Sequence, residues 1–197
     1  MSQSFADIAY TASVRKVQQR NGSHESRHYP GVSGESYEGL SVREAGFISE
    51  RDSFYLSTVS ESGWPYVQHR GGPAGFLRVL DSHTLAYADF SGNRQYVSVG
   101  NLEVNNRVAL IMTDYANRQR LKIFGRIRMI ENHDNPDLLV QLAMPGYRAK
   151  VERAMIIDVQ ASDWNCPQHI VRRFSEEQVQ AMLAPLLEEN RLLKAAH

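Results

Sequence analysis

The residues that most suggest chemistry form a short polar loop, SGNRQ, at positions 91–95. Arg94 offers a planar guanidinium that suits phosphate oxygens, and Asn93 and Gln95 add neutral hydrogen-bond donors beside it. If a helix begins near residue 95, its free backbone N–H groups and the positive end of its dipole face the same place. The loop therefore predicts an anion site, and the alternative is a polar turn that caps a helix.

A pair of glycines in HRGGP (69–73) follows a predicted strand. Glycines there indicate either close approach of a ligand to the backbone or a bulge or tight turn before Pro73. No Walker or Rossmann glycine pattern occurs, so no motif supports binding of ATP or NAD.

The stretch DWNCPQH (163–169) holds three side chains that could act on a ligand. Trp164 could stack on a planar ring, and Cys166 with His169 could form a nucleophile pair or bind a metal. The alternative is a packed tryptophan beside a buried thiol. His24 and His28 lie four residues apart in a loop and would share a metal only if that loop were helical. We predict neither a metal site nor a particular catalytic residue.

Composition narrows the possible functions. The 197 residues include 22 Lys and Arg against 22 Asp and Glu, so the basic excess typical of nucleic-acid binders is absent. No polybasic anchor and no apolar run near the ~20 residues of a membrane span occurs. The start, MSQSFADIAY, lacks the pattern of a signal peptide, and the single cysteine excludes an intrachain disulfide. We expect a cytoplasmic protein that binds neither nucleic acid nor membrane.

Apolar periodicity and turn residues predict the elements that would position these side chains. Two capping boxes, Ser41 with Glu44 and Ser175 with Gln178, mark helix starts. Pro185 should kink or split the last helix. The expected helices are 5–20, 42–51, 95–104, 134–143 and 175–194. The expected strands are 54–59, 64–70, 77–80, 84–88, 107–112, 120–129 and 153–161.

The clearest periodic signal is RLKIFGRIRM at 120–129, where apolar and mostly basic residues alternate. One face must lie in the core, and the basic face meets solvent, a partner or a ligand. Strands at hairpin spacing indicate a mostly β fold with flanking helices, built on an antiparallel sheet or barrel. We divide the chain into an arm of helix and loop (1–40), a barrel (41–174) and a final helix (175–197).

Several separated stretches, in the same order, resemble the FMN-binding split barrel of the pyridoxamine 5′-phosphate oxidase family, and most closely its flavin-nucleotide-binding branch. They are SGWPYVQHRGGP, LAYADFSGNRQY, GNLEVNNRVALIMTDY, RLKIFGRIR and DWNCPQHI. The resemblance implies an antiparallel split β-barrel, bound FMN, and a homodimer with flavin sites at the subunit interface.

The resemblance also implies positions for the site residues. A strand comprising Gln68, His69, Arg70 and Gly71 would run along the flavin ring. The ribityl chain or phosphate would meet Tyr87, Ala88 and Asp89. The phosphate would bind at Arg94, with Asn93 beside it and Gln95 where the oxidases have Lys. A flavin-contacting Gln of the oxidases corresponds to Arg120, and Trp164 would reach the flavin of the second subunit.

One departure concerns the substrate. The Arg-Leu-His type segment with which the oxidases grip pyridoxamine phosphate is not found, and Arg172 and Arg173 follow DWNCPQHI instead. Arg70 or Arg120 could stabilise reduced flavin near its N1–C2 edge. We expect an FMN-dependent oxidoreductase acting on an unidentified small molecule. The alternatives are a flavin-binding protein without turnover, which stores or senses FMN, and a binder of another cofactor such as a deazaflavin or haem.

Overall fold

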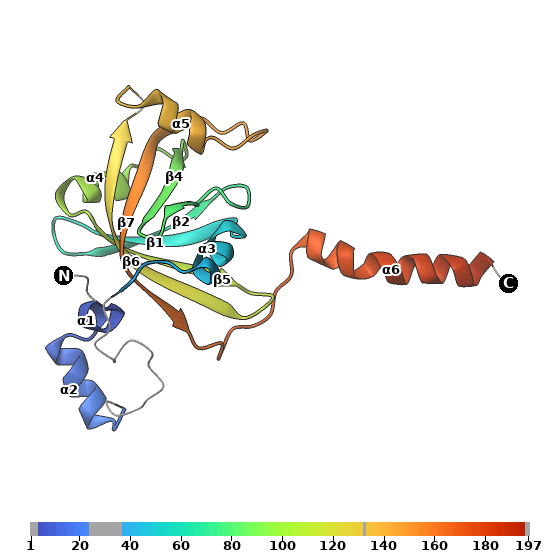
Figure 1. The fold of residues 1–197 in the computed structure, drawn as a ribbon, viewed down its shortest axis with the longest axis horizontal. Helices are drawn as coiled ribbons and strands as arrows, with labels where there is room; N and C mark the ends of the chain where they lie inside the picture. The colour runs from blue at the N-terminus through green and yellow to red at the C-terminus, as the bar shows by residue number, and fades with distance from the viewer. Residues whose placement is uncertain (1–3, 24–36, 132, 196–197) are drawn as a thin grey trace.

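The computed structural model describes residues 4–23, 37–131 and 133–195, and it shows one antiparallel sheet with helices around it (Figure 1). The strands are β1 (Ser53–Val59), β2 (Pro65–Gly71), β3 (Arg78–Asp81), β4 (Thr84–Phe90), β5 (Arg107–Asp114), β6 (Gln119–Glu131) and β7 (Val151–Asn165). The helices are α1 (Phe5–Ala9), α2 (Ala12–Arg20), α3 (Val42–Ser49), α4 (Val97–Val104), α5 (Pro136–Leu142) and α6 (Glu176–Ala195).

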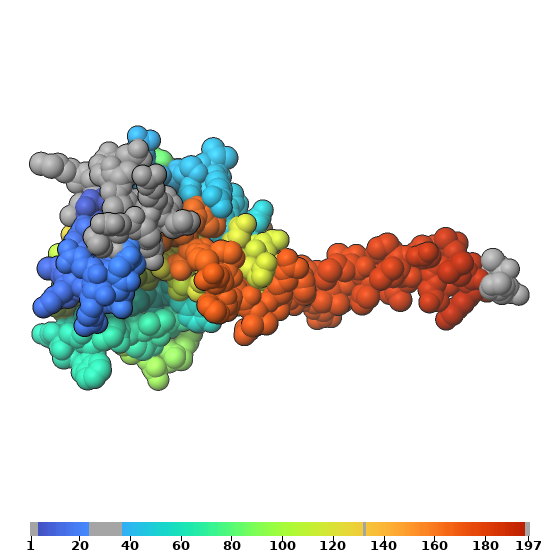
Figure 2. Space-filling model, turned by 90° about the horizontal axis from the view of Figure 1, so that it is seen from below, coloured from blue at the N-terminus to red at the C-terminus, as the bar shows by residue number. Residues whose placement is uncertain are grey.

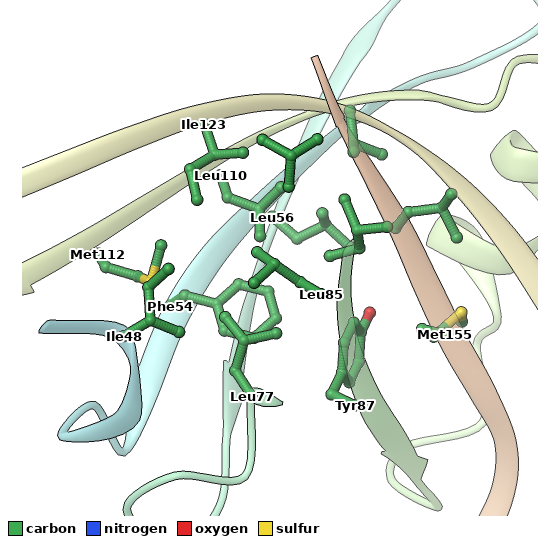
Figure 3. Close-up of a cluster of buried hydrophobic side chains, with 14 of the residues drawn as sticks. Ile48, Phe54, Leu56, Leu77, Leu85, Tyr87, Leu110, Met112, Ile123 and Met155 are labelled. Carbon is green, nitrogen blue, oxygen red and sulfur yellow. The ribbon is translucent and has the colours of Figure 1, made fainter. Parts of the chain in front are cut away.

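The seven strands lie in the order β2-β1-β5-β6-β7-β4-β3. The sheet stays open, because β2 and β3 are edge strands that do not pair with each other. The prediction of a mostly β protein built on an antiparallel split barrel is confirmed. Aliphatic and aromatic side chains from β1, β4, β5, β6 and β7 fill the interior, as Figure 3 shows. The division of the chain into arm, barrel and final helix stays a prediction.

The two long strands β6 and β7 join the halves of the barrel. As the alternation predicted, Leu121, Ile123 and Ile127 of β6 are buried. The β6–β7 register shifts between Phe124 and Gly125, and a Cβ on Gly125 would lie 2.6 Å from the Ile157 side chain. A bulge of this kind bends a strand. The first part of β6 therefore pairs with β5, and the first part of β7 pairs with β4.

Three sequence predictions need correction. The first helix is broken: α1 ends before Tyr10, and α2 starts where the Thr11 hydroxyl accepts the Val14 N–H at 3.4 Å. The last strand runs to Asn165, so Trp164 lies on β7 rather than in an irregular segment. Pro185 does not split the last helix, since α6 continues through it.

The ends of the described chain differ in how they meet the barrel. Phe5 of α1 stacks on Phe124 of β6 with ring centroids 4.9 Å apart, so α1 covers part of the face that we expected to be basic. Helix α6, by contrast, projects away from the barrel (Figures 1 and 2), and none of its residues is buried. Within the described ranges, no helix combines the length and the hydropathy that crossing a bilayer requires.

Candidate functional site

A buried carboxylate lies between two arginines at the end of β4. Asp89 is only 4% exposed, and its oxygens accept hydrogen bonds from Arg70 at 2.8 Å and from Arg153 at 2.9 Å. Antiparallel pairing explains one contact, because Asp89 and Arg153 are cross-strand partners on β4 and β7. Burial raises the pKa of the Asp89 carboxyl, and the two guanidiniums oppose that rise. Asp89 thereby fixes the orientation of Arg70.

A second acid lies at the same end of β7. The Glu152 carboxylate accepts a hydrogen bond from the Tyr96 hydroxyl at 3.1 Å. Hydrogen bonds from Ser91 and Tyr96, together with Arg153 and Arg94, lower the pKa of Glu152. Glu152 therefore stays ionised near Arg94.

The predicted anion loop has an unusual backbone. Arg94 and Tyr96 have positive φ angles of 60° and 54°, and the Asn93 side chain accepts the Gln95 N–H at 3.1 Å. Non-glycine residues in this conformation are uncommon and often mark functional sites. The two left-handed residues delay the start of α4 to Val97, two residues later than predicted.

Helix α4 begins without a side-chain cap. Its first-turn N–H groups therefore lack the acceptor that a cap would supply, and they can bind another acceptor such as an anion. The helix is held to the sheet by polar contacts: Ser98 donates to Gln68 at 2.8 Å, and Asn101 donates to Thr58 at 3.0 Å. These contacts fix the helix start beside the loop.

The loop, the helix start and the ends of β2 and β4 enclose a hollow of about 50 Å³. This volume suits a phosphate, since pockets for whole ligands measure roughly 300–1,000 Å³. The Arg70 Nε is buried and has no hydrogen-bond partner among the described residues. The lining holds two arginines and two acids, so their formal charges cancel. Binding of an anion would therefore depend on unpaired hydrogen-bond donors more than on net charge. The lining residues are Gln68, Arg70, Asp89, Phe90, Gly92, Asn93, Arg94, Tyr96, Ser98, Val99 and Glu152.

Some predicted site residues point elsewhere. Tyr87 is 1% exposed and packs edge-on against Phe54 in the core, where burial raises the pKa of its hydroxyl. Ala88 is also buried, in the cluster beneath α5. Only the backbone of these two residues is left to meet a cofactor.

The strand β2 presents its predicted residues unequally. His69 lies edge-on against Tyr55, with ring centroids 5.5 Å apart, while Gln68 and Arg70 line the hollow. Gly71 ends the strand. A Cβ on Gly72 would lie 2.9 Å from the Phe76 ring, so close packing accounts for that glycine.

Arg120 and Trp164 lie at the other end of β7. Arg120 pairs with Asn165 and Asp89 pairs with Arg153, so twelve residues of β7 separate the two groups. At about 3.3 Å per residue, this is roughly 40 Å of strand. One chain therefore does not bring all the predicted site residues together.

Trp164 is packed against α3 of its own chain. Its indole N–H donates to Glu44, the Arg43 guanidinium lies 4.2 Å from its ring centroid, and Phe47 meets it edge-on at 4.9 Å. The side chain is half-buried at the border of the core. These contacts agree with the packed-tryptophan alternative.

Arg120 is held by backbone groups at the same end of the strand. It donates to the carbonyl of Cys166 at 2.9 Å, while its Nε is buried without a partner in the described part of the chain. Cys166 carries a free, exposed thiol. No group of three His, Cys, Asp or Glu side chains within residues 4–23, 37–131 and 133–195 could hold a metal ion. His24 and His28 lie outside those residues.

A larger hollow of about 410 Å³ lies against α1, β1, β5, β6 and β7. It contains the cross-strand partners Arg107 and Arg126, together with Phe124 and Gln160. None of the predicted site residues lines it.

The sequence analysis missed Ser98, Tyr96, Glu152 and Arg153. Ser98 and Tyr96 follow the SGNRQ loop directly, so a wider window around that loop would have included them. Glu152 and Arg153 come from β7 and enter the site only through pairing with β4. Opposite charges at strand ends are a weak sign of such pairing, because many exposed pairs look the same in a sequence.

The chain is similar to one family of known proteins. The sequence matches a family model described as pyridoxamine 5′-phosphate oxidase over residues 43–177. A comparison with curated protein sequences finds no match.

Solved structures are similar to the chain at low sequence identity. HupZ of Group A Streptococcus matches with a TM-score of 0.52 and 15% identity, over 68% of this chain and 100% of that chain. A putative pyridoxamine 5′-phosphate oxidase from Lactobacillus delbrueckii matches with a TM-score of 0.48 and 18% identity, over 64% and 93% of the two chains. An FMN-binding protein from Syntrophomonas wolfei matches with a TM-score of 0.46 and 12% identity, over 63% and 88%.

Proposed function

Because the chain belongs to the pyridoxamine 5′-phosphate oxidase family, we propose that it binds FMN and is a flavin-dependent oxidoreductase in the cytoplasm. The observation that carries the proposal is the hollow at the start of α4, where Arg70 and Arg94 meet an uncapped helix start. Its volume of about 50 Å³ and its donors suit the phosphate of FMN.

The residues present fit this cofactor. The buried Nε of Arg70 is a donor without a partner among the described residues, and Gln68 and Asn93 add amide groups beside it. The negative charges of the two acids oppose the binding of an anion, but both acids have partners. Two arginines bind Asp89, and the Tyr96 hydroxyl donates a hydrogen bond to Glu152. The donors of the hollow therefore remain for the phosphate.

When bound, the flavin supplies the hydride chemistry, and the chain supplies binding and electrostatics. Arg94 and the first turn of α4 would bind the phosphate. Asp89 would keep Arg70 in place, and a guanidinium near the N1–C2 edge would stabilise the reduced ring. Arg70 and Arg120 are the candidates for that position. We propose a small-molecule substrate of unidentified structure.

The spread of the site residues along β7 supports a homodimer. One flavin cannot span the roughly 40 Å of strand between Arg153 and Asn165 within one chain. A second copy could instead bring its own Arg120 and Trp164 to the first copy's flavin. We therefore propose flavin sites at the interface of two subunits.

A second candidate is a flavin-binding protein without turnover. It is favoured by the acids that line the hollow, because Asp89 is paired with two arginines and Glu152, whose pKa is lowered by hydrogen bonds and nearby arginines, is a weak base. Oxidation of NADH or NADPH by the FMN-loaded protein would decide between the two candidates: turnover supports the enzyme, and tight flavin without turnover supports the binder.

Binding of FMN and of riboflavin, which lacks the phosphate, tests the site directly. We expect flavin absorption bands on the protein with FMN and much weaker binding of riboflavin. Arg94→Ala should weaken FMN binding by about 1.5–3 kcal/mol, roughly tenfold to a hundredfold, and leave riboflavin binding unchanged. Arg118→Ala is a matched control, since Arg118 is another exposed arginine with positive φ, at the β5–β6 turn.

Two results would contradict this proposal. If the protein gains no flavin absorption bands with FMN and releases no flavin on heating, FMN binding is refuted. Equal losses of FMN affinity in Arg94→Ala and Arg118→Ala would remove Arg94 from the phosphate site. A band unlike that of flavin would point to a deazaflavin or haem.

A further inference from the structure

Helix α6 carries an apolar stripe that nothing in the described chain covers. Its 20 residues project from the barrel (Figures 1 and 2), and none is buried. The exposed apolar side chains are Val179, Met182, Leu183, Leu186, Leu187, Leu192 and Leu193.

An unpacked helix of this sequence is poorly stabilised by itself. Most helical stability in proteins comes from packing of an apolar face, and a proline inside a helix destabilises it. Pro185 lies at the middle of α6. Packing of the stripe against another surface would offset that cost.

The stripe follows a heptad repeat. Val179, Leu186 and Leu193 recur every seven residues, which makes them d positions, and Glu176, Leu183 and Asn190 then fall at a positions. The outward b, c and f positions are mixed. Some are polar and include the Glu188–Arg191 ion pair at 2.7 Å. The others are Ala181, Ala184, Pro185, Leu192 and Ala195. Pro185 falls at an outward c position, away from the a and d residues.

We propose that α6 forms a parallel two-stranded coiled coil with α6 of a second copy of this chain. In a parallel pair, residues of equal number share a layer, so Asn190 meets the second copy's Asn190 and can exchange hydrogen bonds with it. A single Asn at an a position specifies such a register.

Charge complementarity supports the same direction. In a parallel pair, a g residue faces the e residue five positions later on the other helix, so Glu189 faces the second copy's Lys194. In an antiparallel pair, Asn190 would meet apolar d residues, and Glu189 would lie away from Lys194. The parallel arrangement thus pairs Asn190 and Glu189, and its one layer of like charges, Glu176 against the second copy's Glu176, lies at the first residue of the helix.

The coil is independent of the flavin site and of the barrel interface. Only contacts between the two α6 helices stabilise the coil, so a failure of the protein to bind FMN would not affect it. If both interfaces form, the coil would tether two barrels at their α6 ends.

Disulfide formation in the full chain tests the proposal. In a Cys166→Ser background, Leu193→Cys should form a disulfide-linked dimer under mild oxidation, because equal d residues adjoin in a parallel pair. Leu192→Cys is the matched control, since it is the adjacent leucine and lies at an outward c position. We expect the Leu193→Cys variant to cross-link at least tenfold faster.

Other cross-linking outcomes would overturn the proposal. Equal rates for the two variants, or no cross-linking of Leu193→Cys, would exclude a parallel coil with residue 193 at its interface. A mixture of Glu176→Cys and Leu193→Cys chains that yields mainly heterodimers would instead show an antiparallel pair, in which a residues such as 176 face d residues such as 193.

A helicity measurement gives a second test that does not depend on cross-linking. Leu186→Asp should reduce the far-ultraviolet helical signal of the full chain, while Leu192→Asp should leave it unchanged. The apo protein suffices, so the barrel and its flavin do not affect the readout. An unchanged helical signal in Leu186→Asp would contradict the coiled coil.

Discussion

The two ends of strand β7 hold their charged residues in different ways. At the Arg153 end, Asp89 is almost completely buried between two guanidiniums, and Arg70, whose buried Nε has no partner among the described residues, lines a hollow with Arg94. At the Asn165 end, the backbone holds Arg120, and Trp164 packs on α3. We propose an anion site at the first end, whereas the second end is occupied with contacts inside its own chain. A ligand shared by both ends would need two chains.

The largest effect should come from the buried carboxylate. Asp89→Ala leaves Arg70 and Arg153 without their shared partner, and removing one member of a buried pair costs about 3–5 kcal/mol. Urea unfolding of the apo protein would measure the loss. Asp158→Ala is the matched control, since its pair with Arg128 is 3.2 Å long but half-exposed, and it should cost less than about 1 kcal/mol.

Equal losses of unfolding free energy in Asp89→Ala and Asp158→Ala would contradict the difference that we draw between the two ends of β7. They would mean that the Arg153 end is no better organised by charge than an ordinary surface pair. A large loss confined to Asp89→Ala would instead support its role in positioning Arg70.

How well the strands of the fold could be predicted from the sequence depended on whether a strand is buried on one face or on both. Alternation identified β6 correctly, because one face of that strand meets the core and the other is mostly basic. The run LAYADF gave no such signal, since β4 packs against the barrel interior on one side and the cluster beneath α5 on the other. The sequence therefore could not show that Tyr87 is a core residue.

The candidate site was predictable only where it is local in sequence. Asn93, Arg94 and Gln95 form one loop, and a loop with an arginine before a helix has a readable chemistry. Arg153 comes from a distant strand, and no local pattern reveals which strand will pair with β4. The separation of Trp164 from Arg94 likewise depends on the length of β7, which the prediction placed four residues too short at that end.

A smaller loss should come from the opposite end of β7. Trp164→Ala removes contacts with Phe47, Arg43 and Glu44, and we expect destabilisation of about 1–3 kcal/mol, less than for a fully buried tryptophan. Thermal or urea unfolding would measure it. Trp64→Ala is the control, because Trp64 is 75% exposed, and it should change stability by no more than about 0.5 kcal/mol.

Flavin fluorescence sharpens this test, because Trp164→Phe keeps an aromatic ring against α3. If a second copy brings Trp164 to the flavin, that variant should alter the fluorescence of bound FMN without unfolding the protein. Unchanged fluorescence would restrict Trp164 to packing, and unchanged stability in Trp164→Ala would contradict the contacts with α3.

The smallest effect concerns Gln95, the one position of the loop where the oxidases have a lysine. Gln95 is not one of the residues that line the hollow, but it lies between two of them, Arg94 and Tyr96. A lysine there would add a positive charge beside a lining of two arginines and two acids. Gln95→Lys should tighten FMN binding by about 0.5–1.5 kcal/mol, and the gain should shrink at high salt, because the loop is exposed. The backbone contact of residue 95 with Asn93 would survive the change, since it uses the main-chain N–H.

Gln19→Lys supplies the matched control for this prediction. Gln19 is exposed on α2 and, unlike Gln95, has no neighbour in sequence that lines the hollow, so the same change in net charge there should leave FMN affinity unaltered. Equal gains in the two variants would mean that total charge, and not the loop, attracts the anion. If Gln95→Lys tightened FMN without affecting riboflavin, the gain would depend on the phosphate. The Arg153 end of β7 would then be the phosphate end of the site, and Trp164 could reach the same flavin only from a second chain.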